Sequence, residues 1–409
     1  MRYLLITSIP FGRQNDSLVI DGLWAEDLKA LAAAAGPVTV AAPELKAEEL
    51  KSWGPALATL TAQDQISFVS LPKYTSRFNV SNLIRSRRIL YDAVLNADIV
   101  HSSNLFHPYT FLYYGHDVAI RLKRKTLFVV AEDFYDMEVW GWLRRESNPL
   151  KRWRARRIIL QQDRHVRKRV QSSSLTFLHT PAAVARYREY AANAVAIRQP
   201  MHEENEVISV ERFQAKCASI RNNDPLILCA ACRLEPLKGV DFMVRAIAIL
   251  KQRGIPVRAR FYGRGQQLTS LKRIARRLEV EDQVDFPGSL APIATLREAL
   301  AEGHLFLMPH LTSDFGRAFF DAMAAGSPVI AFRSRASEDT VRHEVDGLIT
   351  PNADDEGLAD GIARFHHDRE MLVRTAIAAR IRALDNTKSF WNRYRLQMIQ
   401  GLFDESAVE

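Results

Sequence analysis

The chain has 409 residues, 47% of them hydrophobic and 25% charged, a composition typical of a globular protein with room for two domains. No uninterrupted apolar segment approaches the roughly 20 residues of a membrane span, and the first residues, MRYLLITSIP, have the pattern of a strand rather than of a signal peptide. Three cysteines are too few for a disulfide framework, which favours a reducing cytoplasm.

The formal net charge of +9 is concentrated in one segment. Between Arg144 and Val170 there are eleven Lys/Arg and only two acidic residues, so this segment carries the whole net charge of the chain. Basic charge is therefore a local feature. A surface coated with cations for binding nucleic acid is not expected.

The first half of the chain alternates short β-rich runs with longer helical ones. We expect strands at 3–7, 38–42, 66–71, 98–103, 126–131 and 175–180, and helices at 22–35, 79–95 and 106–122. This alternation predicts a parallel, doubly wound α/β sheet, which binds ligands at the carboxyl ends of its strands. The loop after the first strand, SIPFGRQND, offers Gly12 and Arg13 to a phosphate or a sugar, and a plain loop fits it equally well.

The strand at 126–131 leads into AEDFYD, which places Glu132 at a carboxyl end. A carboxylate there could orient or deprotonate a substrate hydroxyl. A helix N-cap or a solvated loop accounts for it as well. We expect His101, His107 and His116, on nearby segments, to be structural rather than catalytic.

The second half repeats the alternation, with expected strands at 226–232, 257–263, 283–288, 304–309 and 329–332. Between 195 and 225 the pattern breaks, and we place a domain boundary near Pro200. Arg233 and Lys238 follow the first of these strands in CRLEPLKGVD. Two cations at a strand's carboxyl end beside a new helix favour an anion clamp over ordinary surface charge. Gly263 and FPGSL at 286–290 follow later strands of this half, and each is a weak signal that also resembles strand-end loops of the family named below.

Residues 309–330, PHLTSDFGRAFFDAMAAGSPVI, predict a turn-rich loop, a helix and a buried strand. Gly326 and Pro328 should end the helix. A loop that feeds a helix N-terminus presents free backbone N–H groups and the positive end of a dipole, which is a site for an anion.

This stretch resembles the signature of the family 4 retaining glycosyltransferases, roughly Glu-x-Phe-Gly-x4-Glu-Ala-Met-Ala-x-Gly-x-Pro-Val. Ser313 and Asp321 stand where that signature has its two glutamates. CRLEPLKGVD is similar to a second motif of the family, Arg-Leu-x-Pro-x-Lys-Gly-x-Asp. The likeness covers the second half of the chain and extends only loosely to the first. There the family's paired glycines are reduced to Gly12, and Glu132 replaces a histidine.

The resemblance implies a GT-B fold of two Rossmann-like domains. It gives an acceptor-binding domain at 1–200, a sugar-nucleotide-binding domain at 201–385 and a helix at 386–409 that packs back on the first domain. The implied reaction moves a sugar, with retention, from a UDP- or GDP-sugar to a glycan or lipid-linked acceptor hydroxyl. No Asp-x-Asp motif occurs, so we expect no metal. The implied catalytic residues are Arg233, Lys238 and Glu132, and those binding the donor are Gly12, Arg13, Gly263, Ser313, Asp314, Phe315, Gly316 and Asp321.

The departures at Ser313 and Glu132 keep a second class open, a non-catalytic sugar-nucleotide-binding protein on the same fold. An epimerase on this fold is less well supported. The basic segment has three interpretations: a solvated helix face, a site for a long acidic or phosphorylated acceptor, or a surface that docks on anionic lipid at the inner membrane face. The last would use Arg152, Arg154, Arg156 and Arg157 beside tryptophan.

Overall fold

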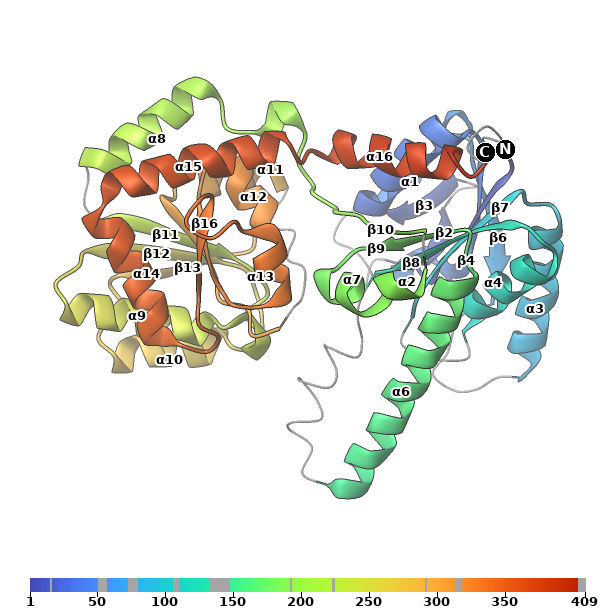
Figure 1. The fold of residues 1–409 in the computed structure, drawn as a ribbon, viewed down its shortest axis with the longest axis horizontal. Helices are drawn as coiled ribbons and strands as arrows, with labels where there is room; N and C mark the ends of the chain where they lie inside the picture. The colour runs from blue at the N-terminus through green and yellow to red at the C-terminus, as the bar shows by residue number, and fades with distance from the viewer. Residues whose placement is uncertain are drawn as a thin grey trace. The chain divides into compact units, whose positions relative to one another are not determined.

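The computed structural model describes the chain except for residues 15–16, 51–56, 73–79, 106–109, 132–147, 192, 223–224, 291–292, 313–317 and 404–409. The described chain divides into two compact units (Figure 1). Unit 1 is formed by two segments of the chain, the first from Met1 to Ile197 and the second from Asn392 onward. Unit 2 spans Arg198–Trp391. The return to unit 1 falls within the last helix, α16 (Lys388–Gln400).

Unit 1 is built on a mostly parallel sheet. Its strands are β1 (Tyr3–Ile6), β2 (Phe11–Gln14), β3 (Ser17–Asp21), β4 (Val38–Lys46), β5 (Leu57–Leu60), β6 (Ile66–Leu71), β7 (Ile99–Ser103), β8 (Lys125–Val130), β9 (Leu175–Leu178) and β10 (Ala194–Ala196). In the described residues they run in the order β10-β9-β8-β7-β1-β4-β2-β3-β5, with β6 paired to β4. The β2–β3 and β3–β5 pairs are antiparallel. The parallel part is doubly wound, as predicted, because β4 and β7 flank β1 on opposite sides.

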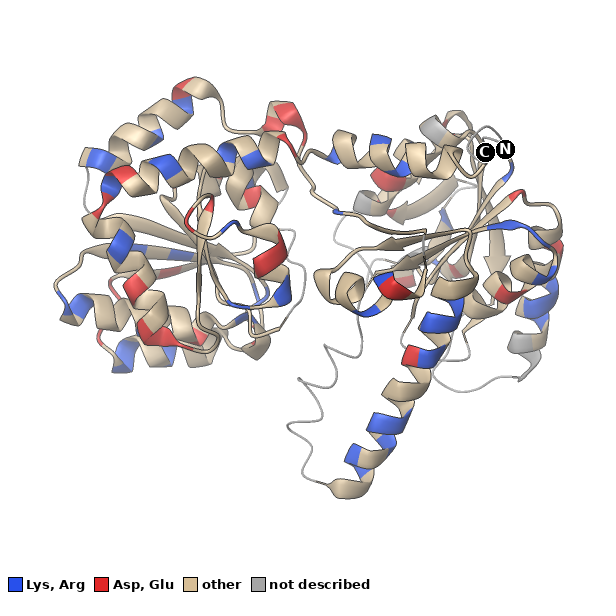
Figure 2. Cartoon of the chain, in the orientation of Figure 1, with Lys and Arg blue, Asp and Glu red and all other residues tan. Residues whose placement is uncertain are grey.

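The helices of unit 1 connect these strands. They are α1 (Gly22–Ala35), α2 (Ala47–Leu50), η1 (Ala62–Asp64), α3 (Val80–Leu95), α4 (Phe111–Arg121), α6 (Pro149–Ser172), α7 (Pro181–Tyr187) and η2 (Arg188–Tyr190). Asn148 caps α6 by accepting from the backbone N–H of Leu150 and Lys151, and Pro149 occupies its first position. Figure 2, in which Lys and Arg positions are blue, shows several of them along this helix.

Unit 2 has a fully parallel six-stranded sheet. Its strands are β11 (Leu226–Ala231), β12 (Val257–Tyr262), β13 (Val284–Gly288), β14 (Leu305–Met308), β15 (Val329–Phe332) and β16 (Gly347–Thr350). The order is β13-β12-β11-β14-β15-β16, so the chain reverses direction across the sheet between β11 and β14. That is the doubly wound Rossmann order, and its switch point between β11 and β14 is where such sheets bind ligands.

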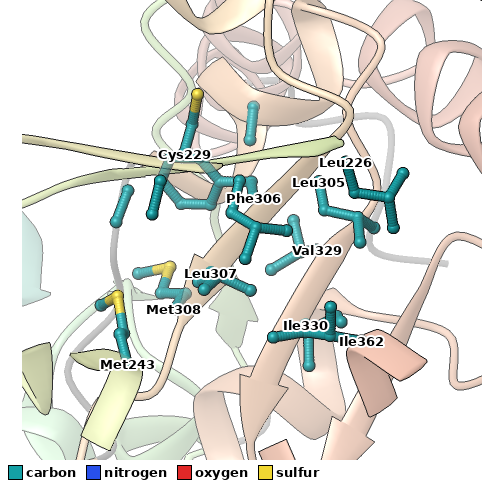
Figure 3. Packing of buried hydrophobic residues seen from close by; sticks show 14 of the residues in the cluster. Leu226, Cys229, Met243, Leu305, Phe306, Leu307, Met308, Val329, Ile330 and Ile362 are labelled. Atoms are coloured by element: carbon teal, nitrogen blue, oxygen red, sulfur yellow. The ribbon is translucent and has the colours of Figure 1, made fainter. Parts of the chain in front are cut away.

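The core of unit 2 surrounds this sheet. Its helices are η3 (Glu204–Glu206), α8 (Val210–Asn222), η4 (Pro236–Lys238), α9 (Val240–Gln252), α10 (Leu268–Arg277), α11 (Ile293–Ala301), α12 (Ala318–Ala324), α13 (Arg335–Thr340), α14 (Asp355–His367) and α15 (Arg369–Leu384). Leu305, Phe306, Leu307 and Met308 of β14 are all buried, as expected for a central strand covered on both faces (Figure 3).

The expected strands and helices are present. However, β2, β3, β5 and β10 were not predicted, β4 extends beyond the predicted 38–42 to Lys46, and the closing helix ends at Gln400. The loop predicted at SIPFGRQND is wrong in part, because Phe11–Gln14 form β2, held by backbone pairing to β3 and β4. The helix predicted from residue 106 begins at Phe111 in the described chain, where the side chain of Thr110 accepts from the backbone N–H of Leu112 as an N-cap.

Candidate functional site

The switch point of unit 2 is closed by loops that hydrogen-bond to one another. The backbone N–H of Leu234, after β11, donates to the carbonyl of Arg264, after β12, at 2.9 Å. The N–H of Gly263 donates to Gly288 at the end of β13 (2.9 Å), and that of Leu311, after β14, donates to Leu237 (3.0 Å). Four strand ends therefore form one frame around the expected donor site.

Two glycines allow these loops to approach so closely. A Cβ on Gly239 would lie 2.0 Å from the carbonyl oxygen of Pro309, and one on Gly263 would lie 1.9 Å from that of Cys232. Both residues also have positive φ, +65° and +146°. Any other residue would be strained at these positions and would push the strand-end loops apart.

The two predicted clamp cations lie at the carboxyl end of β11 and differ in exposure. Lys238 is buried in η4. The side chain of Arg233 is 72% exposed, and it donates to the Glu235 carboxylate at 2.9 Å. Burial raises the pKa of the Cys232 thiol to about 11, and the positive charges of Lys238 and Arg233 oppose that rise.

The signature helix α12 is almost wholly buried and is anchored at its carboxyl end. Lys216 of α8 donates from Nζ to the carbonyl of Ala325 and to the hydroxyl of Ser327, each at 2.7 Å. Burial lowers the pKa of this lysine to about 7. Gly326 ends the helix with φ +69°, as predicted.

Asp321 on α12 lies in a buried ion network. Its carboxylate is 7% exposed and 3.4 Å from Nε of Arg297, which is also 7% exposed. Arg297 further donates to the carbonyl of Met201 at 2.8 Å and contacts the carboxylate of Glu206. Ribose binding by Asp321 remains a prediction. The structure shows its charge compensated within unit 2.

Arg297 and Lys216 were not among the residues singled out from the sequence, and Gly239 was noted only as a match to the second family motif. Arg297 precedes Leu300 by three positions on α11, so helical spacing alone places it on the buried face. The hydrogen bond from Lys216 to the carbonyl of Ala325 could not be predicted from local spacing, because the two residues are 109 positions apart.

Five other predicted site residues lie outside the described residues. They are Glu132, Ser313, Asp314, Phe315 and Gly316, together with His107 among the histidines.

In unit 1, Gly12 and Arg13 lie in β2, and Arg13 is the register partner of Lys46 at the end of β4. Nε of Arg13 is 3.3 Å from the Glu44 carboxylate. These residues border a cavity of about 430 Å³ lined by Arg13, Glu44, Leu45, Lys46, Ser70, Leu71, Pro72 and Arg85.

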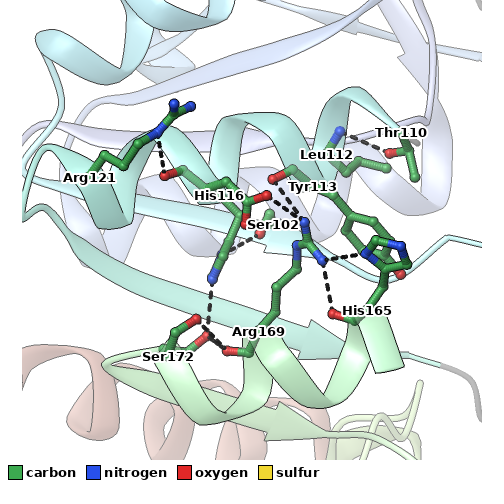
Figure 4. A network of polar contacts seen from close by, with 11 residues as sticks. Ser102, Thr110, Leu112, Tyr113, His116, Arg121, His165, Arg169 and Ser172 are labelled. Atoms are coloured by element: carbon green, nitrogen blue, oxygen red, sulfur yellow. Dashed lines mark hydrogen bonds and ion pairs between the residues drawn. The ribbon is translucent and has the colours of Figure 1, made fainter. Parts of the chain in front are cut away.

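His116 is structural, as expected. It is fully buried in α4, with Nδ1 3.1 Å from the hydroxyl of Ser102 and Nε2 3.4 Å from that of Ser173 (Figure 4). Burial lowers its pKa to about 3. His101 is bonded through Nδ1 to the Tyr3 hydroxyl at 2.8 Å, and burial lowers its pKa likewise.

The carboxyl-terminal half of α6 is fixed to α4 by polar contacts. Arg169 pairs with Asp117 at 2.7 Å and stacks over the Tyr113 ring with its guanidinium carbon 4.0 Å from the centroid (Figure 4). Gln162 donates to the Tyr113 hydroxyl at 2.8 Å. These contacts hold the helix rigidly at one end.

The amino-terminal half of α6 is exposed. Leu150 is 76% and Trp153 58% exposed, and Arg157 stacks over Trp153 at 4.9 Å. The arginines at 152, 154, 156 and 157 are all exposed. Within the described ranges, no helix combines the length and apolar composition that crossing a membrane requires.

The chain contains two doubly wound units, and in the second the loops at the switch point are hydrogen-bonded to one another. This architecture is the GT-B fold. HepE of Anabaena, solved in complex with UDP, matches it with a TM-score of 0.69 at 16% identity, covering 98% of this chain and 100% of that one. Sucrose-phosphate synthase of Thermosynechococcus elongatus matches with a TM-score of 0.68 at 16% identity, covering 98% and 99%. At these identities the likeness shows the fold.

Residues 211–382 match the family described as glycosyl transferases group 1. A GDP-mannose-dependent α-(1-6)-phosphatidylinositol monomannoside mannosyltransferase of Mycobacterium tuberculosis is 32% identical over 164 residues, 38% of this chain and 42% of that protein. The amylovoran biosynthesis glycosyltransferase AmsK of Erwinia amylovora is 29% identical over 179 residues, 42% and 44%. The matched segment thus spans less than half of these relatives.

Proposed function

We propose that this protein is a retaining glycosyltransferase that moves a sugar from a UDP- or GDP-sugar to an acceptor hydroxyl. The observation that carries the proposal is the frame at the switch point of unit 2, where β11 and β14 are neighbouring strands and the loop after β11 carries Arg233 and the buried Lys238. The family match over residues 211–382 supports the same reaction class.

The main demand on the catalyst is electrostatic. As the bond to the sugar breaks, negative charge develops on the departing diphosphate, and preorganised cations stabilise it without having to reorganise. Lys238 and Arg233 are the residues we assign to this role. Loop residues Ser313, Asp314, Phe315 and Gly316 would bind the donor, and Gly263 would let the backbone approach it. Transfer without a metal is part of the proposal.

We assign acceptor binding to unit 1, with Glu132 as the group that orients or deprotonates the acceptor hydroxyl. The mycobacterial relative is named for transfer to a phosphatidylinositol monomannoside, and AmsK for the biosynthesis of an exopolysaccharide. These names support a glycan or a lipid-linked acceptor.

We further propose that the exposed half of α6 docks the protein on an anionic membrane surface. Its exposed side chains combine arginines with Leu150 and Trp153, a composition suited to the headgroup layer. The other half of the helix is fixed by Arg169, so the docking surface is rigid relative to unit 1.

A second candidate is a sugar-nucleotide-binding protein without catalysis, favoured by Ser313 and Glu132 at positions where the family has other residues. One experiment separates the two. The protein is screened by thermal shift against UDP-, GDP- and ADP-sugars, and the best donor is then incubated with acceptor extract while released nucleoside diphosphate is measured. Ligand at 100 times its Kd adds about 2.7 kcal/mol to the free energy of unfolding. Binding with turnover supports the enzyme, binding without turnover supports the binder, and no binding contradicts both.

A further inference from the structure

The cavity in unit 1 has an excess of positive charge among its lining residues. Of its eight lining residues, Arg13, Lys46 and Arg85 are cationic and only Glu44 is anionic. Its volume of about 430 Å³ falls within the range of about 300–1,000 Å³ typical of small-molecule sites.

The position of the cavity is that of a ligand site. β4 ends at Lys46 and β6 at Leu71, and the two strands are parallel, so their carboxyl ends share one edge of the sheet. This is the edge at which doubly wound sheets bind ligands. β2 lies beside the end of β4, and the register that pairs Arg13 with Lys46 brings these two cations to the same place.

The charge of the cavity is not balanced from within. Glu44 is matched by Arg13, 3.3 Å away. Lys46 and Arg85 form no ion pair with any residue in the described part of the chain, although both line the same hollow. A ligand with about two negative charges would complete the balance, which is the charge of a phosphate monoester near neutral pH.

The remaining lining groups indicate what carries that phosphate. Ser70 and Glu44 line the cavity together with the cations. Both can accept hydrogen bonds from hydroxyl groups, which a polyol supplies in greater number than inorganic phosphate. Arginine offers two parallel N–H donors to phosphate oxygens, and lysine adds a point charge.

We propose that this cavity binds the phosphate of a phosphorylated polyol, a sugar or cyclitol phosphate that is free or esterified to a lipid, as part of the acceptor. The inference rests on the proposed function, because it places the acceptor in unit 1. It reassigns Arg13 from the donor, where the sequence resemblance put it, to the acceptor. Arg85 and Lys46 bind the phosphate, and Glu44 and Ser70 bind the hydroxyls.

The test uses the full chain and three soluble probes, myo-inositol 1-phosphate, myo-inositol and inorganic phosphate, titrated calorimetrically at low salt. Myo-inositol 1-phosphate should bind at least about tenfold more tightly than either other probe. The double variant Lys46→Gln/Arg85→Gln should lose at least about tenfold in that affinity. The matched control Lys272→Gln/Arg273→Gln, two exposed cations on α10 of unit 2, should not.

A parallel titration with UDP and GDP separates this inference from the proposed function. Unchanged nucleotide binding in Lys46→Gln/Arg85→Gln, together with lost polyol phosphate binding, supports the acceptor site. The inference would be overturned if Lys46→Gln/Arg85→Gln lost nucleotide binding and the wild-type protein did not bind the polyol phosphate. These cations would then belong to the donor site. Equal binding of myo-inositol and its phosphate would overturn the inference as well. If neither nucleotide binds the wild-type protein, the proposed function fails, while the polyol phosphate titration still decides the cavity.

A final arm identifies the source of the phosphate. Short-chain phosphatidylinositol in neutral detergent micelles is compared with free myo-inositol 1-phosphate. Tighter binding of the lipid that the double variant abolishes supports an esterified ligand. Tighter binding of free myo-inositol 1-phosphate supports a soluble ligand. If the double variant binds both ligands as tightly as the wild type does, the site is contradicted.

Discussion

Nε of Arg297 lies 3.4 Å from the carboxylate of Asp321, and both side chains are only 7% exposed. Arg297 also donates to the carbonyl of Met201, in the segment that enters unit 2. The pair therefore joins the signature helix to the first residues of its unit. A buried cation that keeps only part of its network is costly, since its desolvation is no longer compensated.

Replacing Asp321 by Asn should lower the free energy of unfolding of unit 2 by about 3 kcal/mol, because Arg297 would be left with a neutral partner. Urea denaturation followed by far-UV circular dichroism measures this. Arg212→Ala is the matched control. It removes the exposed pair with Glu298 on the same helix as Arg297 and should cost less than about 1 kcal/mol. If both variants lost the same free energy of unfolding, burial of the Asp321–Arg297 pair would not increase its contribution to stability.

Lys238→Ala and Arg233→Ala should each slow sugar transfer by at least about 100-fold, the effect of removing one preorganised group that stabilises developing charge. Single-turnover rates at saturating donor are the appropriate measurement. Far-UV spectra should be unchanged, and Lys272→Ala, at an exposed position of α10, should retain the wild-type rate. Near-native rates in both variants would show that the clamp has been assigned to the wrong residues.

Ser313→Glu tests whether the departure from the family signature is compatible with catalysis. If the protein is an enzyme, the variant should release nucleoside diphosphate from the donor at least as fast as the wild type, since it restores a charged acceptor for sugar hydroxyls. Release is followed with a coupled assay over long incubation. Micromolar donor binding without release, in wild type and variant alike, would favour the binder.

The elements that were predicted correctly are those whose signal is local. β6 and β15 begin and end where their apolar runs do, and α1 follows its helical spacing. β2 was missed because Phe11–Gln14 is short and polar, and only its pairing with β3 and β4 makes it a strand.

The site divides in the same way. Arg233 and Lys238 follow a recognisable strand, so their place at its carboxyl end was predictable. The cavity of unit 1 was not, because its cations come from β2, β4 and α3, which meet only in the folded sheet. The Arg297–Asp321 pair likewise depends on how α11 packs on α12.

The stability of unit 1 should fall as the pH is lowered from 6.5 towards 3. Burial depresses the pKa of His116 from 6.5 to about 3, so the folded protein keeps the imidazole neutral while the unfolded chain takes up a proton below pH 6.5. Proton uptake by the unfolded state lowers the free energy of unfolding, by about 2 kcal/mol at pH 5 for this one group.

Denaturation at pH 7 and pH 5 measures this effect. In His116→Gln the difference between the two pH values should shrink by that amount. Ser102→Ala, which removes a hydrogen-bond partner and keeps the imidazole, should preserve the difference. The same pH dependence in His116→Gln as in wild type would mean that other groups cause it.

The basic half of α6 should bind vesicles that contain anionic lipid and release them as salt rises. The helix presents Arg152, Arg154, Arg156 and Arg157 together with exposed Trp153. Each cation near an anionic surface contributes about 1 kcal/mol, so several engaged together suffice for reversible attachment. Screening at higher ionic strength should weaken it.

Cosedimentation with vesicles with and without phosphatidylserine, at low and high salt, is the decisive measurement. Replacing the four arginines by Ser should reduce binding at least about 100-fold, because about 4 kcal/mol of attraction is removed. The matched control replaces Lys272, Arg273, Arg276 and Arg277 of α10 by Ser, an equal loss of exposed charge on unit 2. If that control loses binding equally, net charge rather than α6 attracts the protein to the vesicles. If the wild type fails to bind anionic vesicles even at low salt, the docking surface is refuted, and a soluble acidic acceptor becomes the better explanation of the arginines.

Trp153→Ala distinguishes insertion from simple adsorption, since only an inserted ring contributes apolar burial that high salt does not screen.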